Sequence, residues 1–372
     1  MTRDLPLSGL VVVSLEQAVA APFATSRLAD AGATVYKIER PEGDFARGYD
    51  SLASGQSSYF VWVNRGKQSI VIDLSQQADR EKLLALVAGA DVFVQNLRHG
   101  TLDRFGLSPA DLRARFPRLI CCSITGFADD GAMARRKAYD LLIQAEAGLA
   151  SITGGPEAPA RVGISVVDIA TGAAAHAAIL EALLYRARSG QGADIQVSLF
   201  DVIADWMTVP LLQAEGGQPP TRLGLAHPSI APYGVFKTRE GRLVLLSVQN
   251  DREWARLCGI LLGDSAHATD PRFATNLARS HNRSLTDGLV GDAVAARDFA
   301  AVAQVLEEAD IAFAEVNDLR GLSAHPALRR ITVETPGGPV SMPAPGARTS
   351  FQAEHYGPVP AQGENRLSAV GD

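Results

Sequence analysis

Cysteine is scarce in this sequence, and long apolar runs are absent. Three cysteines among 372 residues are too few for a disulfide framework, and such usage is typical of a reducing compartment. The first apolar run, "LVVVS", is too short for a signal peptide. No segment approaches the roughly 18 consecutive apolar residues that a membrane span needs. We therefore expect a cytoplasmic protein that does not bind membranes.

An excess of basic residues is also lacking. Lys and Arg number 35 against 41 Asp and Glu, which gives a net charge of −6 and an isoelectric point near 5.7. This charge balance does not indicate a protein that binds nucleic acid. The length and the ordinary composition, with 47% hydrophobic residues, allow two globular domains.

Several common motifs are missing. The segment after the first apolar run reads "SLEQAVAAPFATSRLADAG", without the G-x-G-x-x-G of NAD and FAD enzymes. Neither a Walker A sequence nor a G-x-S-x-G elbow occurs, which argues against a P-loop ATPase and an α/β serine hydrolase. The seven histidines never fall at metal-ligand spacing with Cys or a carboxylate, so we expect no metal site.

Short apolar runs alternate with helical patterns in the first half, which predicts an α/β fold with a parallel sheet. We expect strands at 10–14, 34–38, 69–73, 91–95, 119–124 and 194–199. We expect helices at 22–31, 77–88, 108–115 and 172–187. In such a sheet the loops after the strands bind ligands.

The second half predicts a smaller α+β unit. Two β-rich runs on either side of "REGR" indicate a hairpin, and helical patterns follow at about 251–262, 282–294 and 297–308. The segment 215–234 is rich in Gly and Pro and is interpreted as a linker or a functional loop. The tail from about 333 has little periodicity.

One carboxylate stands alone in an apolar setting. Asp168 lies in "VGISVVDIATGAAAHAAILEALLYRA" (162–187), before an Ala-rich helix. An ionised group that is buried without a partner is costly, so the sequence needs a reason to place it there. Either Asp168 caps the helix, or it is a nucleophile held at the helix N-terminus.

Three basic stretches complete the pattern: "YKIERPEGD" (36–44), "NLRHGTLDRFG" (96–106) and "ARRKAYD" (134–140). The first two follow expected strands, where an α/β sheet collects anionic ligands. Each stretch by itself is typical of a solvated loop. Together with Asp168, and without a redox or nucleoside triphosphate motif, they suggest a ligand with several phosphates that is neither NAD nor ATP.

An ordered series of segments resembles the class III coenzyme A transferases. It runs through "LSGLVVVSLEQAVAAPFATSRLADAGATVYKIERPEGD", "NRGKQSIVIDL", "NLRHGTLDRFGLS", "SITGFADDG", "AYDLLIQAEAGL" and "SGQGADIQVSLFD". It continues through "DPRFATNLAR" (270–279) and "IAFAEVNDLRGLSAHPAL" (311–328), so it covers nearly the whole chain. That family includes formyl-CoA, carnitine and succinyl-CoA-dependent transferases, and α-methylacyl-CoA racemase is a relative.

The resemblance implies an interlocked homodimer, in which each subunit has a Rossmann-like large domain and a smaller α+β domain. The corresponding parts are a large CoA-binding domain 1–205, a linker 206–226, a small domain 227–318, a linker 319–345, and a tail 346–372 that returns to the large domain. The implied partners are an acyl-CoA donor and a carboxylic acid acceptor. Coenzyme A enters as a substrate thioester, so no resident cofactor is implied.

The resemblance also assigns roles to residues. Asp168 matches the catalytic aspartate, which forms a mixed anhydride and then an aspartyl-CoA thioester. The small residues around it suit close approach of an acyl group, and helix N–H groups are expected to steady the oxyanion. The positions that match CoA-binding residues are Arg40, Asn96, Arg104 and Lys137. Tyr139 matches a position beside the reacting carbonyl, and Gln17 lies near the expected acyl site.

The sequence departs from the family at two places. Formyl-CoA transferase has four consecutive glycines where this chain reads "GLAHPSIAPYG" (224–234), so His227 or Ser229 is expected to contact the acyl group instead. The last segment of this sequence reads "GENRLSAVGD", whereas relatives have Gly-Glu-His-Thr followed by a terminal helix. Among relatives without the glycine run, small dicarboxylic acids are common substrates, and Arg161 or His227 is a candidate to hold the second carboxylate.

Two other functions compete with the transferase. An acyl-CoA racemase or isomerase removes a proton next to the thioester, and the racemase has a His before the Asp that corresponds to Asp140. Here that residue is Tyr139, which is a poor base at neutral pH, so the transferase is favoured. An inactive CoA-binding or scaffold protein is supported by the altered loop and tail alone.

Overall fold

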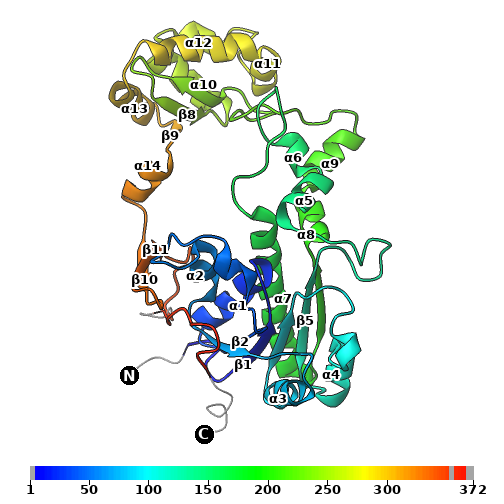
Figure 1. The fold of residues 1–372 in the computed structure, drawn as a ribbon. Helices are drawn as coiled ribbons and strands as arrows, with labels where there is room; N and C mark the ends of the chain where they lie inside the picture. The colour runs from blue at the N-terminus through cyan, green and yellow to red at the C-terminus, as the bar shows by residue number, and fades with distance from the viewer. Residues whose placement is uncertain (1–4, 352–355, 366–372) are drawn as a thin grey trace. The chain divides into compact units, whose positions relative to one another are not determined.

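The chain forms two compact units. The computed structural model describes residues 5–351 and 356–365, so parts of the expected tail, 352–355 and 366–372, lie outside the described residues. The first unit takes its described residues from Met1–Ala150, Arg161–Leu211 and Arg329–Asp372, and the second from Ser151–Ala160 and Leu212–Leu328 (Figure 1).

The first unit is built on a six-stranded sheet in the order β3-β2-β1-β4-β5-β6, and all its strand pairs are parallel. The strands are β1 (Val11–Leu15), β2 (Thr34–Glu39), β3 (Lys67–Val71), β4 (Val92–Gln95), β5 (Ile120–Thr125) and β6 (Asp194–Ser198). The predicted α/β fold with a parallel sheet is confirmed. The strand order reverses between β1 and β4, which is the switch point where such sheets bind ligands.

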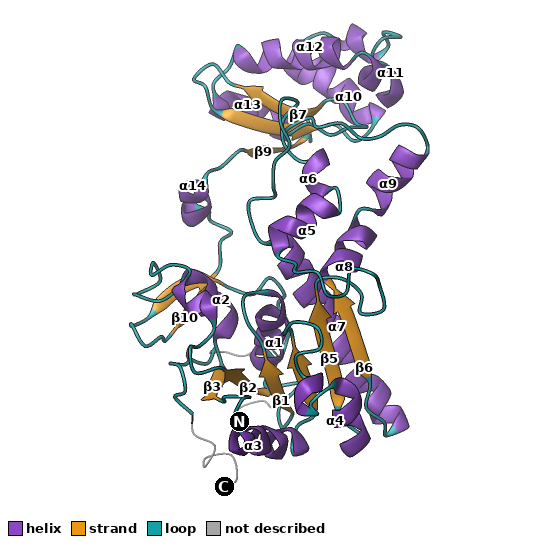
Figure 2. Cartoon of the chain, turned by 45° about the vertical axis from the view of Figure 1, so that its right-hand side comes forward, coloured by secondary structure: helices purple, strands orange, loops and turns teal. Residues whose placement is uncertain are grey.

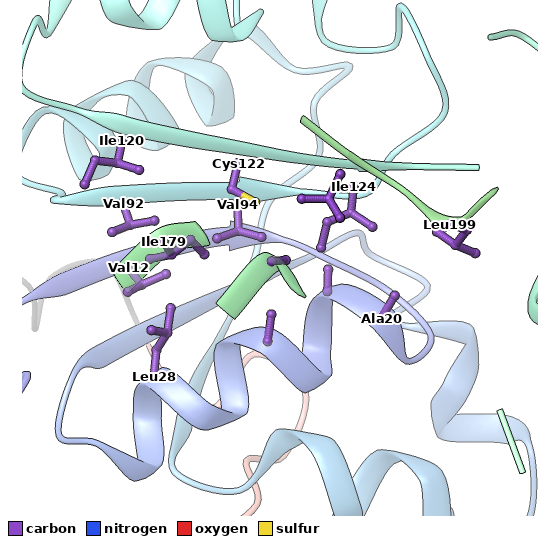
Figure 3. Close-up of a cluster of buried hydrophobic side chains, with 14 of the residues drawn as sticks. Val12, Ala20, Leu28, Val92, Val94, Ile120, Cys122, Ile124, Ile179 and Leu199 are labelled. Carbon is purple, nitrogen blue, oxygen red and sulfur yellow. The ribbon is translucent and has the colours of Figure 1, made fainter. Parts of the chain in front are cut away.

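Helices cover both faces of this sheet (Figure 2). On one face, α1 (Ala20–Asp30) and α7 (Val166–Ser189) enclose a core that includes Val12 and Val94 (Figure 3). On the other face, α3 (Gln77–Ala88) and α4 (Pro109–Arg115) enclose Val13 and their own apolar side chains. Adjacent residues of β1 thus serve opposite cores, because side chains alternate along a strand.

The helix that carries Asp168 begins earlier than the sequence predicts. It starts at Val166 rather than at residue 172, and it packs closely on α1. At Gly172 a Cβ atom would lie 2.5 Å from the carbonyl oxygen of Ala20, so glycine permits this approach. By length and composition alone, α7 could cross a membrane, but its buried residues belong to the core between α1 and the sheet.

Strand β3 also begins earlier than expected, at Lys67 rather than at residue 69. The apolar pattern misses this start because Lys67 is buried, and its ammonium group donates to the Glu16 carboxylate. Four further helices were not expected from periodicity. They are α2 (Ser58–Asn64), α5 (Asp140–Glu146), α6 (Leu149–Ile152) and α8 (Leu199–Trp206).

The second unit contains a three-stranded antiparallel sheet, in which β7 (Tyr233–Lys237) and β8 (Leu243–Ser247) form the expected hairpin. The third strand is β9 (Ala312–Glu315). The helices are α10 (Asp251–Leu257) with a π-helical turn over Cys258–Leu262, α11 (Asn276–His281), α12 (Arg283–Ala295) and α13 (Phe299–Glu308). A separate apolar core, centred on Trp254, holds this unit together.

The segments expected as linkers contain regular structure. Helix α9 (Thr208–Glu215) lies in the first, and α14 (Leu319–Ala324) lies in the second, followed by the antiparallel strands β10 (Arg330–Val333) and β11 (Val340–Pro343). These two strands pack with α2 and with Val359 in a small core of the first unit. Later residues run beside β3, where the N–H group of Asn365 donates to the carbonyl oxygen of Ser69.

Candidate active site

A cavity of about 600 Å³ opens in the first unit at the switch point of the sheet. Its lining includes Gln17, which follows β1, and Asn96, which follows β4. Lys137, Tyr139 and Asp168 also line it. The structure therefore brings together five of the residues that the sequence assigned to a site, from four separate segments of the chain.

Asp168 is the third residue of α7 and is half-buried in this cavity. Among the described residues, no hydrogen bond or ion pair reaches its carboxylate. Burial, and then the negative charge of Asp140, raise the pKa of Asp168 to about 7. Its carboxylate is therefore a stronger base than an ordinary one and is not neutralised by a fixed cation.

The helix-capping interpretation of Asp168 is wrong, because Asp140 has that role. One oxygen of Asp140, Oδ1, accepts hydrogen bonds from the N–H groups of Val167 and Asp168, at 2.8 and 3.1 Å. The N–H groups of Val166 and Ile169 donate to backbone carbonyls. The first N–H groups of α7 are thus all occupied, and the expectation that they steady an oxyanion fails for this arrangement.

A short chain of hydrogen bonds extends this frame. The other oxygen of Asp140 accepts from the Gln144 side chain at 2.7 Å, and the Gln144 Oε1 atom accepts the N–H group of Val162 at 2.9 Å. Asp140 therefore ties the start of α7 to α5 and to the segment that precedes α7. No local sequence pattern indicates this role, since Asp140 resembles an ordinary first-turn acid.

The loop after β1 is held from both sides. The side-chain amide of Asn96 accepts the N–H group of Gln17 and donates to its carbonyl oxygen, each at 2.9 Å. Ala18 takes a left-handed conformation with φ of 62°, and its N–H group donates to Asp44. Asn96 thus positions the Gln17 backbone with both ends of its amide, which a sequence resemblance to CoA-binding residues does not reveal.

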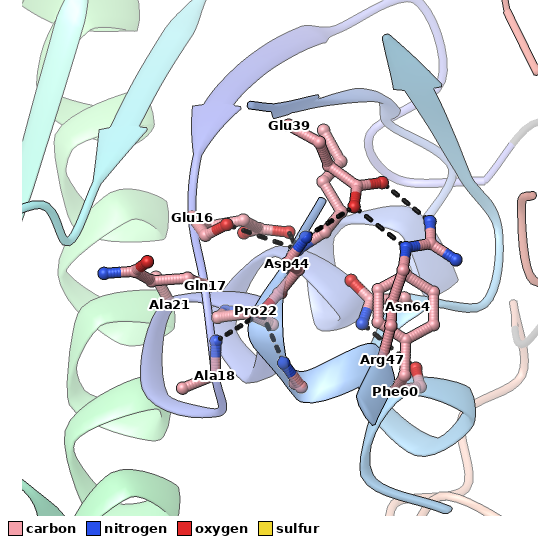
Figure 4. A network of polar contacts seen from close by, with 12 residues as sticks. Glu16, Gln17, Ala18, Ala21, Pro22, Glu39, Asp44, Arg47, Phe60 and Asn64 are labelled. Carbon is pink, nitrogen blue, oxygen red and sulfur yellow. Dashed lines mark hydrogen bonds and ion pairs between the residues drawn. The ribbon is translucent and has the colours of Figure 1, made fainter. Parts of the chain in front are cut away.

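Behind this loop lies a cluster of buried charges (Figure 4). Glu16 contacts both Lys37 and Lys67, and Lys37 also pairs with Asp44 at 2.8 Å, with all four side chains fully buried. Burial opposes the charge of Glu16, but the two lysines hold its pKa below the usual value. Loss of one member would leave a buried charge without a partner, so the cluster keeps the Gln17 loop in one position.

Aromatic side chains form another part of the cavity wall. Tyr49 and Tyr59 meet edge to face with ring centroids 5.4 Å apart, and both line the cavity with Tyr139. Burial, followed by the charges of Asp44 and Asp168, raises the pKa of Tyr49 to about 12. The sequence analysis missed Tyr49 and Tyr59, which lie in a loop and a helix without a distinctive motif.

Arg40 lines a second cavity of about 400 Å³. The two cavities share Gln17, Leu97 and Arg98 in their linings, so they adjoin one another. The Nε atom of Arg40 donates to the carbonyl oxygen of Gly43 at 3.1 Å, which leaves the outer guanidinium nitrogens facing solvent. This arrangement suits an elongated ligand that carries negative charge towards Arg40.

Two other expected site residues lie outside these linings. Arg104 lies in the single turn Asp103–Phe105, with its guanidinium 5.8 Å from the ring centre of Phe105. His227 belongs to the second unit, where it stacks on Tyr233 and its Nδ1 atom accepts the N–H group of Ser229. Its contact with an acyl group stays a prediction.

The cationic side chains of the first cavity differ in their availability. Arg136 is engaged by Glu146 through two bonds of 3.0 Å, and His99 pairs with Asp129. Within the part of the chain that the structure describes, no bonded partner is found for the side chains of Arg98, Arg135, Lys137 and Arg161. No three His, Cys, Asp or Glu side chains of these described residues lie close enough to hold a metal ion.

Comparison with known proteins identifies the family of this chain. The model of CoA-transferase family III matches residues 7–366. The chain belongs to this family. A solved structure of a CaiB/BaiF family protein from Brucella suis superposes on this CoA-transferase with a TM-score of 0.83 at 34% identity, covering 99% of both chains.

Two relatives are similar over most of their length. A succinate–glutarate CoA-transferase from Agrobacterium fabrum is 35% identical over 100% of this chain and 96% of its own. An acetyl-CoA:oxalate CoA-transferase from Acetobacter aceti is 35% identical over 91% of this chain and 89% of its own. The family predicted from the sequence is confirmed, and the chain is a class III CoA-transferase.

Proposed function

We propose that this enzyme moves coenzyme A from an acyl-CoA to a small dicarboxylic acid by covalent relay through Asp168. The observation that carries the proposal is the carboxylate of Asp168, which lies in the cavity at the switch point of the sheet and has no bonded partner among the described residues. The names of the relatives support a dicarboxylic acid, because succinate, glutarate and oxalate are all diacids.

The first half of the reaction uses Asp168 as the nucleophile. Its carboxylate attacks the thioester carbonyl, the C–S bond breaks, and a mixed anhydride forms together with the CoA thiolate. The thiolate then attacks the aspartyl carbonyl, which releases the donor acid and leaves an aspartyl-CoA thioester. The acceptor carboxylate repeats these steps in reverse. The thioester energy is kept at each step, provided that water is excluded.

Charge that develops on the acyl oxygen needs a hydrogen-bond donor. Because the first N–H groups of α7 are occupied, we assign this role to the Tyr139 hydroxyl and the Gln17 amide, which both line the cavity. The clamp of Asn96 on Gln17 supports this role, since it fixes the loop from which the side chain extends. Arg40, Arg98 and Lys137 supply positive charge for the phosphates of CoA.

We also propose the interlocked homodimer that the family resemblance implies. Large apolar side chains remain exposed along α7, α8 and α9 of a single chain: Leu184 is 63% exposed, Tyr185 55%, Trp206 60% and Val209 63%. Apolar surface of this extent on neighbouring helices is typical of a protein interface. A second copy of the chain is the occupant that the family resemblance specifies.

Mass spectrometry of the covalent intermediate tests the catalytic proposal. The protein is mixed with acetyl-, succinyl-, formyl- and mesaconyl-CoA, and the peptide that carries Asp168 is searched for a CoA-sized adduct. We expect an adduct with at least one donor, none in Asp168→Ala, and an unchanged adduct in Glu181→Ala, which alters an exposed acid of the same helix.

The contrary result would move the assignment to the racemase or isomerase alternative. It consists of no adduct with any donor, together with exchange of the α-proton of an acyl-CoA into solvent. A correctly folded Asp168→Ala protein, checked by its unfolding temperature, is required for either conclusion.

A further inference from the structure

The cavity contains a guanidinium that the chemistry of thioester exchange does not require. Arg161 lines the cavity with Asp168, and its side chain is exposed and has no bonded partner within residues 5–351 and 356–365. Unlike Arg136, which Glu146 already engages through two hydrogen bonds, Arg161 is free to receive a carboxylate. An arginine is suited to this because its planar group can donate two parallel hydrogen bonds.

The backbone next to Arg161 is fixed to the same frame that holds Asp168. The N–H group of Val162 donates to Gln144, Gln144 donates to Asp140, and Asp140 accepts the N–H group of Asp168. The base of the Arg161 side chain therefore keeps a set position relative to the nucleophile. A mobile surface arginine would not have this connection.

A diacid substrate brings a charge that must be neutralised in this place. One carboxylate reacts at Asp168, while the other stays ionised in a cavity whose lining also includes Asp140. An ionised carboxylate placed there without a cation would be strongly disfavoured. A monocarboxylic acid has no such charge, so a cation at this point discriminates between the two classes.

The other unpaired cations are placed differently. Arg98 lies where the two cavities adjoin, towards Arg40, and Arg135 and Lys137 lie in the loop before α5. Arg161 is the member of this group that lies in the segment leading into α7.

We propose that Arg161 binds the distal carboxylate of the diacid and so selects dicarboxylic over monocarboxylic substrates. This inference rests on the proposed function, because it needs acyl transfer through Asp168. Arg161 acts on binding and specificity, and the covalent steps stay with Asp168.

Acceptor kinetics test the inference with acetyl-CoA as the donor, so that the donor carries no distal carboxylate. Succinate and glutarate are compared with propionate and butyrate as acceptors for wild type, Arg161→Gln and Arg161→Lys. We expect Arg161→Gln to lower kcat/KM for the diacids by about 10- to 100-fold, and to leave the monoacids within about twofold. Arg161→Lys, which keeps the charge but loses the planar group, should fall between the two.

A matched control and a second readout separate the possible failures. Arg188→Gln changes an exposed arginine at the far end of α7 and should match wild type. If Arg161→Gln weakens all acceptors and all acyl-CoAs equally, Arg161 binds a phosphate of CoA and the inference is overturned. If the wild type forms no Asp168 adduct, the proposed function fails first. If the adduct forms but the diacid preference is unchanged in Arg161→Gln, the inference alone fails.

Discussion

Asp168 combines a requirement for charge with a setting that opposes charge. The proposed mechanism requires the nucleophile to be ionised, whereas burial and Asp140 raise the pKa of Asp168 to about 7. Near neutral pH a substantial fraction of the protein therefore carries a protonated, unreactive Asp168. The benefit is nucleophilicity, because a carboxylate of raised basicity that lacks a fixed cation attacks a carbonyl more readily.

This setting predicts the pH dependence of the first chemical step. The rate of Asp168 adduct formation, measured by rapid quenching at low acyl-CoA, should rise about tenfold per pH unit below 7 and level off above it. In Asp140→Asn the midpoint should move to lower pH, because a charge that raises the pKa is removed while burial remains. An unchanged midpoint in Asp140→Asn would contradict the stated cause.

The same titration has an independent readout in stability. The pKa of Asp168 is raised above its unfolded value of 3.8, so the folded chain binds an extra proton between about pH 4 and 7. The contribution of Asp168 to the free energy of unfolding is therefore complete below about pH 4 and is lost as the pH rises through 7. Asp168→Asn should accordingly unfold at a higher temperature than wild type at pH 8, and the difference should shrink at pH 4.

Single residues were predictable from the sequence where their chemistry is conspicuous. Asp168 stands out as one acid in an apolar run, and Arg40 and Lys137 stand out in basic loops after or between strands. The contacts of Asp140 and Asn96 did not stand out in the same way, because they join residues that lie far apart in the chain. Arg161 was already a candidate to hold a second carboxylate. Asp140 acts on α7 across 27 residues, which no local pattern encodes.

At the scale of elements, the contact between α1 and α7 sets the geometry of the site. The two helices bring the Gln17 loop, which precedes α1, close to the start of α7. Their close approach depends on Gly172 and on the small side chains around it. The small residues near Asp168 therefore have a packing role in addition to any accommodation of the acyl group.

A pair of glycine substitutions tests this contact. Gly172→Ala would place a Cβ atom 2.5 Å from the Ala20 carbonyl oxygen, so we expect a loss of about 1–3 kcal/mol of stability and slower adduct formation. Gly288→Ala is the control, because no atom lies within 4 Å of the added Cβ atom in α12. It should stabilise the protein by up to about 1 kcal/mol. Chemical denaturation of both variants makes the comparison, and equal effects would contradict the packing role.

The elements that the sequence predicts best are those with a strong apolar pattern. The parallel strands and the hairpin of β7 and β8 were recovered with small shifts. The start of α7 was missed because the N–H groups of Val167 and Asp168 are capped by the side chain of Asp140, which lies far away in the chain. The start of β3 was missed because a lysine there is buried with an acid from another strand end.

At the scale of the whole molecule, the proposed homodimer has a direct test. Light scattering after gel filtration should give twice the 39.3 kDa mass of one chain. Introducing charge into the exposed apolar surface with Trp206→Glu and Val209→Glu should reduce the mass to that of one chain or prevent soluble expression. Leu277→Glu in α11 alters a leucine that is 82% exposed and should leave the mass unchanged. A wild type of single-chain mass would contradict the proposal.

Because the first unit is made of separate stretches of the chain, its parts are not synthesised together. Residues 357–365, which line the outer edge of the sheet at Gly66 and Ser69, leave the ribosome after the entire second unit has been made. The smaller unit can therefore complete its own core while β3 still has an uncovered edge. During that interval the nascent first unit exposes a strand that could pair with another chain, so chaperone binding during translation should concentrate on this edge.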